Sequence, residues 1–80
     1  MAATTPDTSS RIEIYVRLLE EGTEVFRPTE ALTLENGLFR VLATTDYDPE
    51  NEKWEFPPES IVRCTTRQDR ESTFLVAVKP

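Results

Sequence analysis

The chain has no histidine and a single cysteine, Cys64, among its 80 residues. One cysteine cannot form a disulfide within the chain, and zinc sites built from Cys and His are excluded. A lone thiol also suits a reducing compartment. A nucleophilic cysteine needs a base, usually histidine, or another group that lowers its pKa. The strand-like neighbours of Cys64 therefore favour a packed core residue over a nucleophile.

Glycine is scarce too, because only Gly22 and Gly37 are present and both lie in expected turns. Two isolated glycines cannot form a glycine-rich phosphate loop. No apolar run approaches the roughly 18 residues of a membrane span. Residues 1–10 are small and polar and lack the basic start and apolar run of a signal peptide. We expect a cytoplasmic protein with no membrane association, a disordered tail over residues 1–10 and one domain over residues 11–80.

Basic side chains are outnumbered, with nine Lys and Arg against fifteen Asp and Glu and a net charge of −6. Binding a nucleic-acid backbone through a broad field requires Lys and Arg to displace counterions, so we expect no nucleic-acid partner. A modest negative net charge is common on soluble domains and does not require a functional explanation. It also fits a basic protein partner, because opposite charges speed encounter.

Apolar residues alternate with polar ones over short runs, and no segment shows a helical period. The clearest run is residues 12–19, where Ile14, Val16 and Leu18 share one face. Further strands are expected over residues 24–27, 30–35, 38–44, 53–56, 61–67 and 73–78. Six or seven short strands predict an all-β fold, a small antiparallel and strongly twisted barrel or sandwich. A Src-homology-3-like barrel closes so few strands most economically.

The dipeptide Asn36-Gly37 separates two of these strands and suits a type I′ turn, in which both central residues have positive φ. A two-residue loop pairs Leu34 with Phe39 and Leu32 with Val41, and it places these four side chains on one face. A second turn is expected at residues 20–23, where Gly22 is free to take positive φ.

The turn at residues 20–23 pairs Arg17 with Phe26. Pro28 follows, and because proline has no amide donor the strand ends there or becomes an edge. The inward faces of all the strands together predict the core. Its expected members are Ile14, Val16, Leu18, Val25, Leu32, Leu34, Phe39, Val41, Trp54, Phe56, Val62, Cys64, Phe74 and Val76.

Residues 45–52 are acidic and contain Pro49, so they are expected to form a surface loop. Carboxylates alternate there as they do in calcium loops. They are Asp46, Asp48, Glu50 and Glu52. However, Asn51 occupies the position where a calcium loop has glycine, and Pro57 the position of its bidentate glutamate. The pattern favours a solvated loop, and we expect no metal and no cofactor.

The outer face of the first hairpin is the sharpest candidate for binding, because it gathers Tyr15, Arg17 and Phe26 opposite the core side. Tyrosine and arginine are enriched at binding hot spots. An alternative is that this face packs beneath residues 53–56 within a closed barrel. Tyr47 and Trp54 are expected on nearby connections.

Residues 43–62 contain an Asp-Tyr pair, an acidic loop, and a hydrophobic pair before a turn and strand. This segment, about a quarter of the chain, resembles the opening of a Src-homology-3 domain. In that family the acidic loop and its neighbouring aromatic residue bind proline-rich peptides. The resemblance would give that role to Tyr47, Asp48, Glu50, Glu52 and Trp54. The Trp-Trp pair and the closing aromatic residue of that family have no counterpart here.

The chain as a whole resembles small uncharacterised bacterial all-β proteins that carry Tyr-Val-Arg-Leu-Leu, Glu-Gly-Thr, Arg-Pro and Trp-Glu-Phe-Pro-Pro. Those motifs are residues 15–19, 21–23, 27–28 and 54–58 here. The resemblance implies a folded domain and no particular chemistry.

No nucleophile–base pair stands out, and fifteen carboxylates allow many chance pairs, so we predict that the domain is not an enzyme. We expect a protein-interaction module, a monomer or weak homodimer, with a protein partner of unknown identity. The expected partner-binding residues are Tyr15, Arg17, Phe26, Tyr47, Asp48, Glu50 and Trp54. The alternative is an acidic inhibitor or immunity-type protein that masks a basic partner. That role would use Asp46, Asp48, Glu50, Glu52, Glu55 and Glu59.

Overall fold

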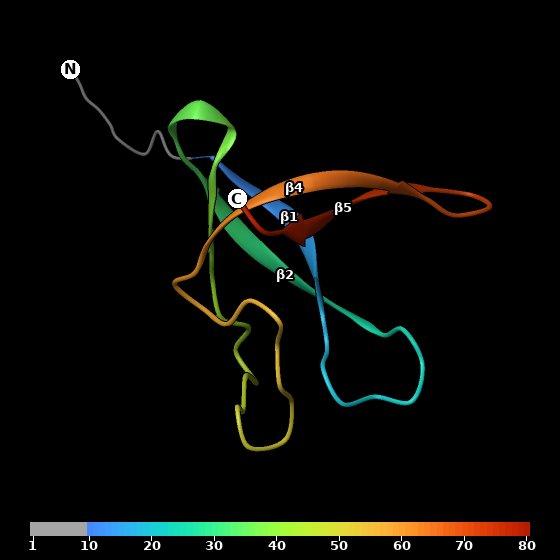
Figure 1. The fold of residues 1–80 in the computed structure, drawn as a ribbon. Helices are drawn as coiled ribbons and strands as arrows, with labels where there is room; N and C mark the ends of the chain where they lie inside the picture. The colour runs from blue at the N-terminus through green and yellow to red at the C-terminus, as the bar shows by residue number, and fades with distance from the viewer. Residues whose placement is uncertain (1–9) are drawn as a thin grey trace.

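Five β-strands form a closed barrel in the order of the sequence (Figure 1). The computed structural model describes residues 10–80. Its strands are β1 (Arg11–Arg17), β2 (Phe26–Thr33), β3 (Phe39–Val41), β4 (Ile61–Gln68) and β5 (Thr73–Val78). Over residues 10–80 the only helical element is a 3₁₀ turn at Glu35–Gly37, and no helix is long and apolar enough to cross a membrane. The predicted small all-β barrel is confirmed, with five strands instead of six or seven.

The predicted strand count is too high for two reasons. Residues 24–27 and 30–35 were expected as separate strands, yet β2 is one continuous strand from Phe26 to Thr33 that joins parts of both. Residues 53–56 form only a single bridge, between Leu18 and Trp54. A hydrogen bond of 2.7 Å from Leu19 N to Lys53 O flanks this bridge. The segment is therefore attached to the end of β1 without being a strand.

Strand β2 does not end at Pro28, because the proline nitrogen faces the side where β2 has no partner. The Leu18 amide donates to Val25 O, and the alternation of an antiparallel ladder then turns the Pro28 nitrogen away from β1. On the opposite side, the last bond joins Leu42 N to Glu30 O at 2.9 Å. One of the two bonds in the next pair, Pro28 with Thr44, would need the amide that proline lacks. Of the two predicted outcomes at Pro28, the strand end is not observed. The strand instead lacks a β3 partner locally at Pro28, although β2 as a whole lies between β1 and β3.

The β1–β2 hairpin has the expected register, with Arg17 opposite Phe26. Its turn differs from expectation in one respect. The positive φ belongs to Glu20, at 66°, whereas Gly22 remains outside the left-handed region.

The Asn36-Gly37 turn forms as predicted, with φ of 63° at Asn36 and 75° at Gly37. Leu38 N donates to Glu35 O at 3.2 Å, as in a type I′ turn. In a regular two-residue hairpin, Glu35 N would also donate a hydrogen bond to Leu38 O. Here Leu34 N makes that bond instead, at 2.8 Å. Two residues thus face one, which is a β-bulge.

The bulge shifts the pairing of β2 with β3 by one residue. Because side chains alternate between faces, a one-residue shift exchanges inward and outward positions. Leu34 is 37% exposed, and Leu32 is half-buried outside the core cluster. The predicted core positions of Leu32 and Leu34, and their predicted partners, are wrong. The observed pairs are Ala31 with Val41, Leu32 with Arg40, and Thr33 with Phe39.

The core fills the inside of the barrel, and the predicted core residues of β1 and β4 all lie in it or against it. Its buried members are Ile14, Val16, Leu18, Ala31, Val41, Trp54, Val62 and Ala77. Partly buried side chains packed against them are Ile12, Val25, Phe39, Tyr47, Phe56, Cys64 and Leu75.

On β5 the inward face differs from the prediction. Leu75 and Ala77 contact the core, so Phe74, Val76 and Val78 lie on the opposite face. Val76 is nevertheless buried, at 5% exposure. The predicted burial of Val76 is thus confirmed, whereas the predicted core position of Phe74 is wrong. Every residue from Phe74 to Val78 is apolar, and an unbroken apolar run does not show which alternate residues face inward.

The barrel closes between β1 and β5, which run parallel and pair only at Tyr15 and Val76. Consecutive strands are antiparallel, so the fifth strand must run in the direction of the first. The β4–β5 hairpin extends away from the other strands toward its turn (Figure 1). We call the short β1–β5 junction the seam.

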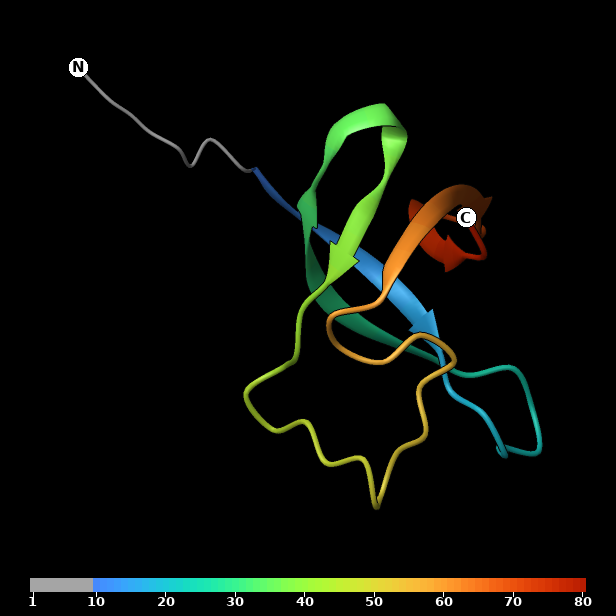
Figure 2. The same cartoon turned by 60° about the vertical axis from the view of Figure 1, so that its left-hand side comes forward.

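Residues 42–60 connect β3 to β4 as a long loop at one end of the barrel, near the β1–β2 loop (Figure 2). At the start of the described chain, the Ser10 carbonyl accepts bonds from Thr33 N at 3.0 Å and from Thr33 Oγ1 at 3.1 Å. The rest of the expected tail, residues 1–9, lies outside the described residues.

Replacing Gly37 by alanine is expected to destabilise the domain by about 1–2 kcal/mol, the usual cost of left-handed backbone for an L-residue. The positive φ of 75° is one reason, and an added Cβ would also lie 3.2 Å from Arg63 Nη1. Urea unfolding followed by the fluorescence of Trp54 measures the change in the free energy of unfolding.

Gly22→Ala is the matched control. An added Cβ at Gly22 meets nothing within 4 Å, and its φ lies outside the left-handed region. Its free energy of unfolding should stay within about 0.5 kcal/mol of the original. Equal losses in the two variants would show that the conformation of Gly37 is not what matters.

Candidate functional site

Three aromatic rings gather on the outside of the barrel across the seam. Tyr15 comes from β1, Phe26 from β2 and Phe74 from β5. Each has at least one chain neighbour that packs in or against the core, so these side chains point outward. The rings of Tyr15 and Phe74 meet edge to face at 5.0 Å, and those of Phe26 and Phe74 at 6.1 Å, both inclined by 66°. We call Tyr15, Phe26 and Phe74 the aromatic face.

Two adjoining hollows open on the aromatic face. All three rings are half-buried, so each leaves part of its surface for contact. The first hollow, of about 290 Å³, is lined by Tyr15, Phe26, Asp69, Ser72 and Phe74. The second, of about 430 Å³, is lined by Glu13, Tyr15, Ser72, Thr73, Phe74 and Leu75.

An arginine from β4 borders the aromatic face. The guanidinium carbon of Arg67 lies 5.4 Å from the ring centroid of Phe26. Arg67 Nη2 also contacts Glu24 Oε1 at 3.1 Å. This hydrogen bond lowers the pKa of Glu24 and raises the pKa of Arg67. The pair keeps the guanidinium over Phe26 and offsets its charge.

The structure unites some of the predicted partner-binding residues and separates others. Tyr15 and Phe26 share the aromatic face, and Arg17 is exposed nearby, where its charge also lowers the pKa of Glu24. The alternative, in which this face packs beneath residues 53–56, is wrong because Trp54 lies in the core.

Phe74 and Arg67 belong to the site but were not predicted. They face each other across the β4–β5 pair. The pairing of these two strands was the signal that could have found them. Phe74 was instead assigned inward, because the apolar run of β5 concealed its orientation.

Tyr47 and Trp54 pack together at the end of the barrel, away from the aromatic face. Their rings meet edge to face at 4.8 Å with an interplanar angle of 70°. Trp54 is 5% exposed, and its Nε1 donates to Glu52 Oε1 at 3.2 Å. These two predicted site residues therefore hold the long loop against the core.

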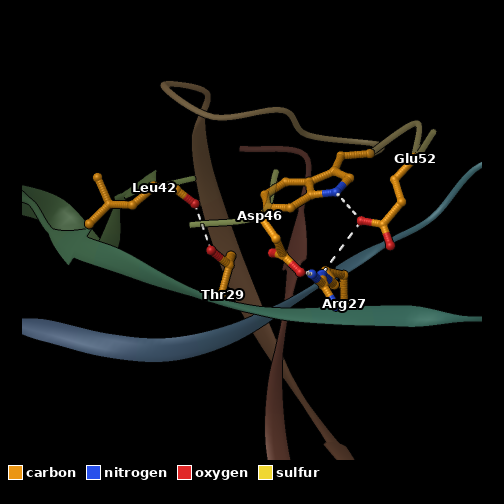
Figure 3. Close-up of polar contacts among 6 residues, drawn as sticks. Arg27, Thr29, Leu42, Asp46 and Glu52 are labelled. Carbon is orange, nitrogen blue, oxygen red and sulfur yellow. Dashed lines mark hydrogen bonds and ion pairs between the residues drawn. The ribbon is translucent and has the colours of Figure 1, made fainter. Parts of the chain in front are cut away.

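Arg27 of β2 attaches the acidic part of that loop to the barrel (Figure 3). Its Nη2 donates to both carboxylate oxygens of Asp46, at 2.6 and 2.7 Å, and its Nε lies 3.5 Å from Glu52 Oε1. Nearby, Thr29 Oγ1 donates to the Leu42 carbonyl at 2.6 Å. We call the contacts of Arg27 with Asp46 and Glu52 the arginine clamp.

Three of the four carboxylates in the acidic loop, those of Asp46, Asp48 and Glu52, contact groups of the protein itself. Asp46 and Glu52 belong to the arginine clamp. Asp48 accepts bonds from Glu50 N at 3.0 Å and Asn51 Nδ2 at 2.8 Å. Within residues 10–80, no group of three or more His, Cys, Asp or Glu side chains is placed to hold a metal ion. Asp48 and Glu50 remain exposed.

Cys64 is half-buried and packs against the core, as predicted. Burial raises the pKa of its thiol. A raised pKa favours the protonated thiol, which is a poor nucleophile.

No protein-family model, no curated protein and no solved structure matches this chain. The similarities to Src-homology-3 domains and to small bacterial proteins therefore stay predictions. The geometry of the aromatic face and of the acidic loop carries the functional inference.

The Asp46 carboxyl is expected to titrate below the usual aspartate value of about 3.9. The hydrogen bond from Arg27 is the main cause, because it favours the charged carboxylate and so lowers the pKa. Arg27→Gln should raise the Asp46 pKa toward the usual value. Carbon NMR titration of the side-chain carboxyl measures both values.

The sign of the effect on stability follows from linkage. The pKa of Asp46 is lower in the folded protein, so the clamp adds stability above about pH 4 and loses it as the pH falls through the folded value. Arg67→Gln is the matched control, because it should raise the pKa of Glu24 and leave that of Asp46 unchanged. An Asp46 pKa that is insensitive to Arg27→Gln would contradict the clamp.

Proposed function

We propose that this domain is a non-catalytic interaction module that binds a protein partner through the aromatic face. One observation carries the proposal: three rings from three strands meet on the outside of the barrel and line two hollows. Clustered aromatic residues on a surface are typical of interaction sites. The proposal includes a cytoplasmic location, suited to the lone thiol, and a monomer or weak homodimer.

The aromatic face is prepared for binding by its position on strands. Tyr15, Phe26 and Phe74 extend from a closed barrel, and each ring contacts another edge to face. A side chain already held in place loses little entropy when a partner arrives. Aromatic residues also supply large contact areas with few rotatable bonds. These rings would therefore act as anchors, and Arg17 and Arg67 would contact the partner at the rim.

A second candidate is the acidic inhibitor, supported by the way the arginine clamp presents Asp48 and Glu50. Both are exposed in a loop attached to β2 through Arg27 and Asp46. Carboxylates held at the end of the barrel would steer a basic partner toward it. Here affinity would come from long-range attraction, whereas the aromatic face would act through short-range contacts.

The test begins with capture of the partner from the native host and measurement of its association and dissociation rates. If the aromatic face is the anchor, Phe26→Ala and Phe74→Ala should each raise the dissociation rate about tenfold or more. The association rate should change little, and salt should have a small effect. Leu34→Ala is the matched control, because Leu34 is apolar and 37% exposed but lies outside the aromatic face.

The acidic candidate predicts the opposite pattern. Asp48→Asn with Glu50→Gln should lower the association rate and remove a steep salt dependence. Lys53→Gln serves as a charge-changing control in the same connection. If a captured partner binds all these variants with unchanged affinity, both candidates are wrong.

A further inference from the structure

We infer that the aromatic face binds an alkylated ammonium group, such as the end of a methylated lysine side chain in the partner. This inference rests on the proposed function and specifies which chemical group of the partner the two hollows of the aromatic face receive. It depends on the inclination of the rings, on the carboxylates that line the hollows, and on Arg67, which already stacks on the ring of Phe26.

The rings form a corner. Phe74 meets Tyr15 and Phe26 edge to face, each at 66°. Ring faces carry negative electrostatic potential and attract cations. A roughly spherical group can contact several inclined rings at once, whereas a flat guanidinium stacks on one. An alkylated ammonium is such a group, and it avoids the strong hydration of a primary ammonium.

Carboxylates line both hollows. Asp69 contributes to the first hollow and Glu13 to the second. Of the described residues, no lysine or arginine lines either one. Among residues 10–80, neither Asp69 nor Glu13 takes part in an ion pair. The Asp69 Oδ1 atom accepts a bond of 2.7 Å from Arg70 N, which orients the carboxylate without neutralising it. These charges complement a cation.

Arg67 shows that this face already accepts a cation. Its guanidinium lies over the ring of Phe26 alone, at 5.4 Å from the centroid. Glu24 offsets the Arg67 charge at 3.1 Å, so Arg67 repels a second cation only weakly. The surfaces of Tyr15 and Phe74 that line both hollows remain for the ligand.

The experiment compares two probes of the same shape. One is choline, and the other is its neutral isostere, in which a tert-butyl group replaces the trimethylammonium group. Each is titrated into the full chain while amide NMR spectra are recorded. Choline should shift the amides of Tyr15, Ser72 and Phe74 in a saturable way. The neutral isostere should bind about fivefold more weakly or worse, because it lacks the attraction of a cation to the rings and carboxylates.

Two variants identify the groups responsible. Phe74→Leu keeps apolar bulk but removes the ring, and Asp69→Asn removes the charge but keeps the bond acceptor. Each substitution should weaken the binding of choline about fivefold and should change the binding of the neutral isostere little. Glu71→Gln is the matched control, because Glu71 lies in the same turn and is exposed but lines neither hollow. It should leave choline binding nearly unchanged.

Each contrary result has a distinct meaning. Equal binding of the two probes would overturn the cation inference and leave the aromatic face as an apolar anchor. Absence of choline shifts at tens of millimolar would also overturn it. Equal weakening by Glu71→Gln and Asp69→Asn would show a general charge effect and overturn the site. If Phe74→Leu fails to fold, the binding of choline and of the neutral isostere to the original chain and to Asp69→Asn still tests the cation inference. The proposed function itself fails only through the partner kinetics of Phe26→Ala and Phe74→Ala.

Discussion

The parallel junction of β1 with β5 is the constraint on which the arrangement of this domain depends. Five strands that each reverse direction leave the first and last parallel, so the barrel can close only through a parallel pair. That pair is limited to Tyr15 and Val76, whereas β4 and β5 pair along most of their length. The strand pairing at the seam is therefore short, and side chains from both of its strands cover it on the outside.

The aromatic face is the outer cover of this seam. Inside the barrel, Ile14 and Val16 of β1 approach Ala77 of β5 in one core. Outside, Tyr15 and Phe74 hold the same two strands together through their rings. Aromatic contacts here thus have a structural role as well as the proposed binding role. The remaining exposed surface of the rings is what a partner would contact.

The long connection between β3 and β4 is stabilised in a different way. It has no strand of its own, and it is held by Trp54 in the core and by the arginine clamp at its acidic part. Arg27 lies beside Pro28, where β2 has an unpaired edge. The edge leaves room for the loop, so the proline and the clamp together determine where the acidic residues lie.

Local chemistry determined much of this fold from sequence alone. The alternation in β1 defines its inward face, and Asn36-Gly37 defines a turn with two positive φ angles. The tertiary structure alone decided the bulge at Leu34, the inward face of β5 and the partner of Arg27. The physical reason lies in the alternation of side chains along a strand. It shows which residues share a face, but it does not show which face is buried when every residue is apolar, as in β5. Pairing between distant segments supplies that information, and it brought Phe74 to Tyr15 and Asp46 to Arg27.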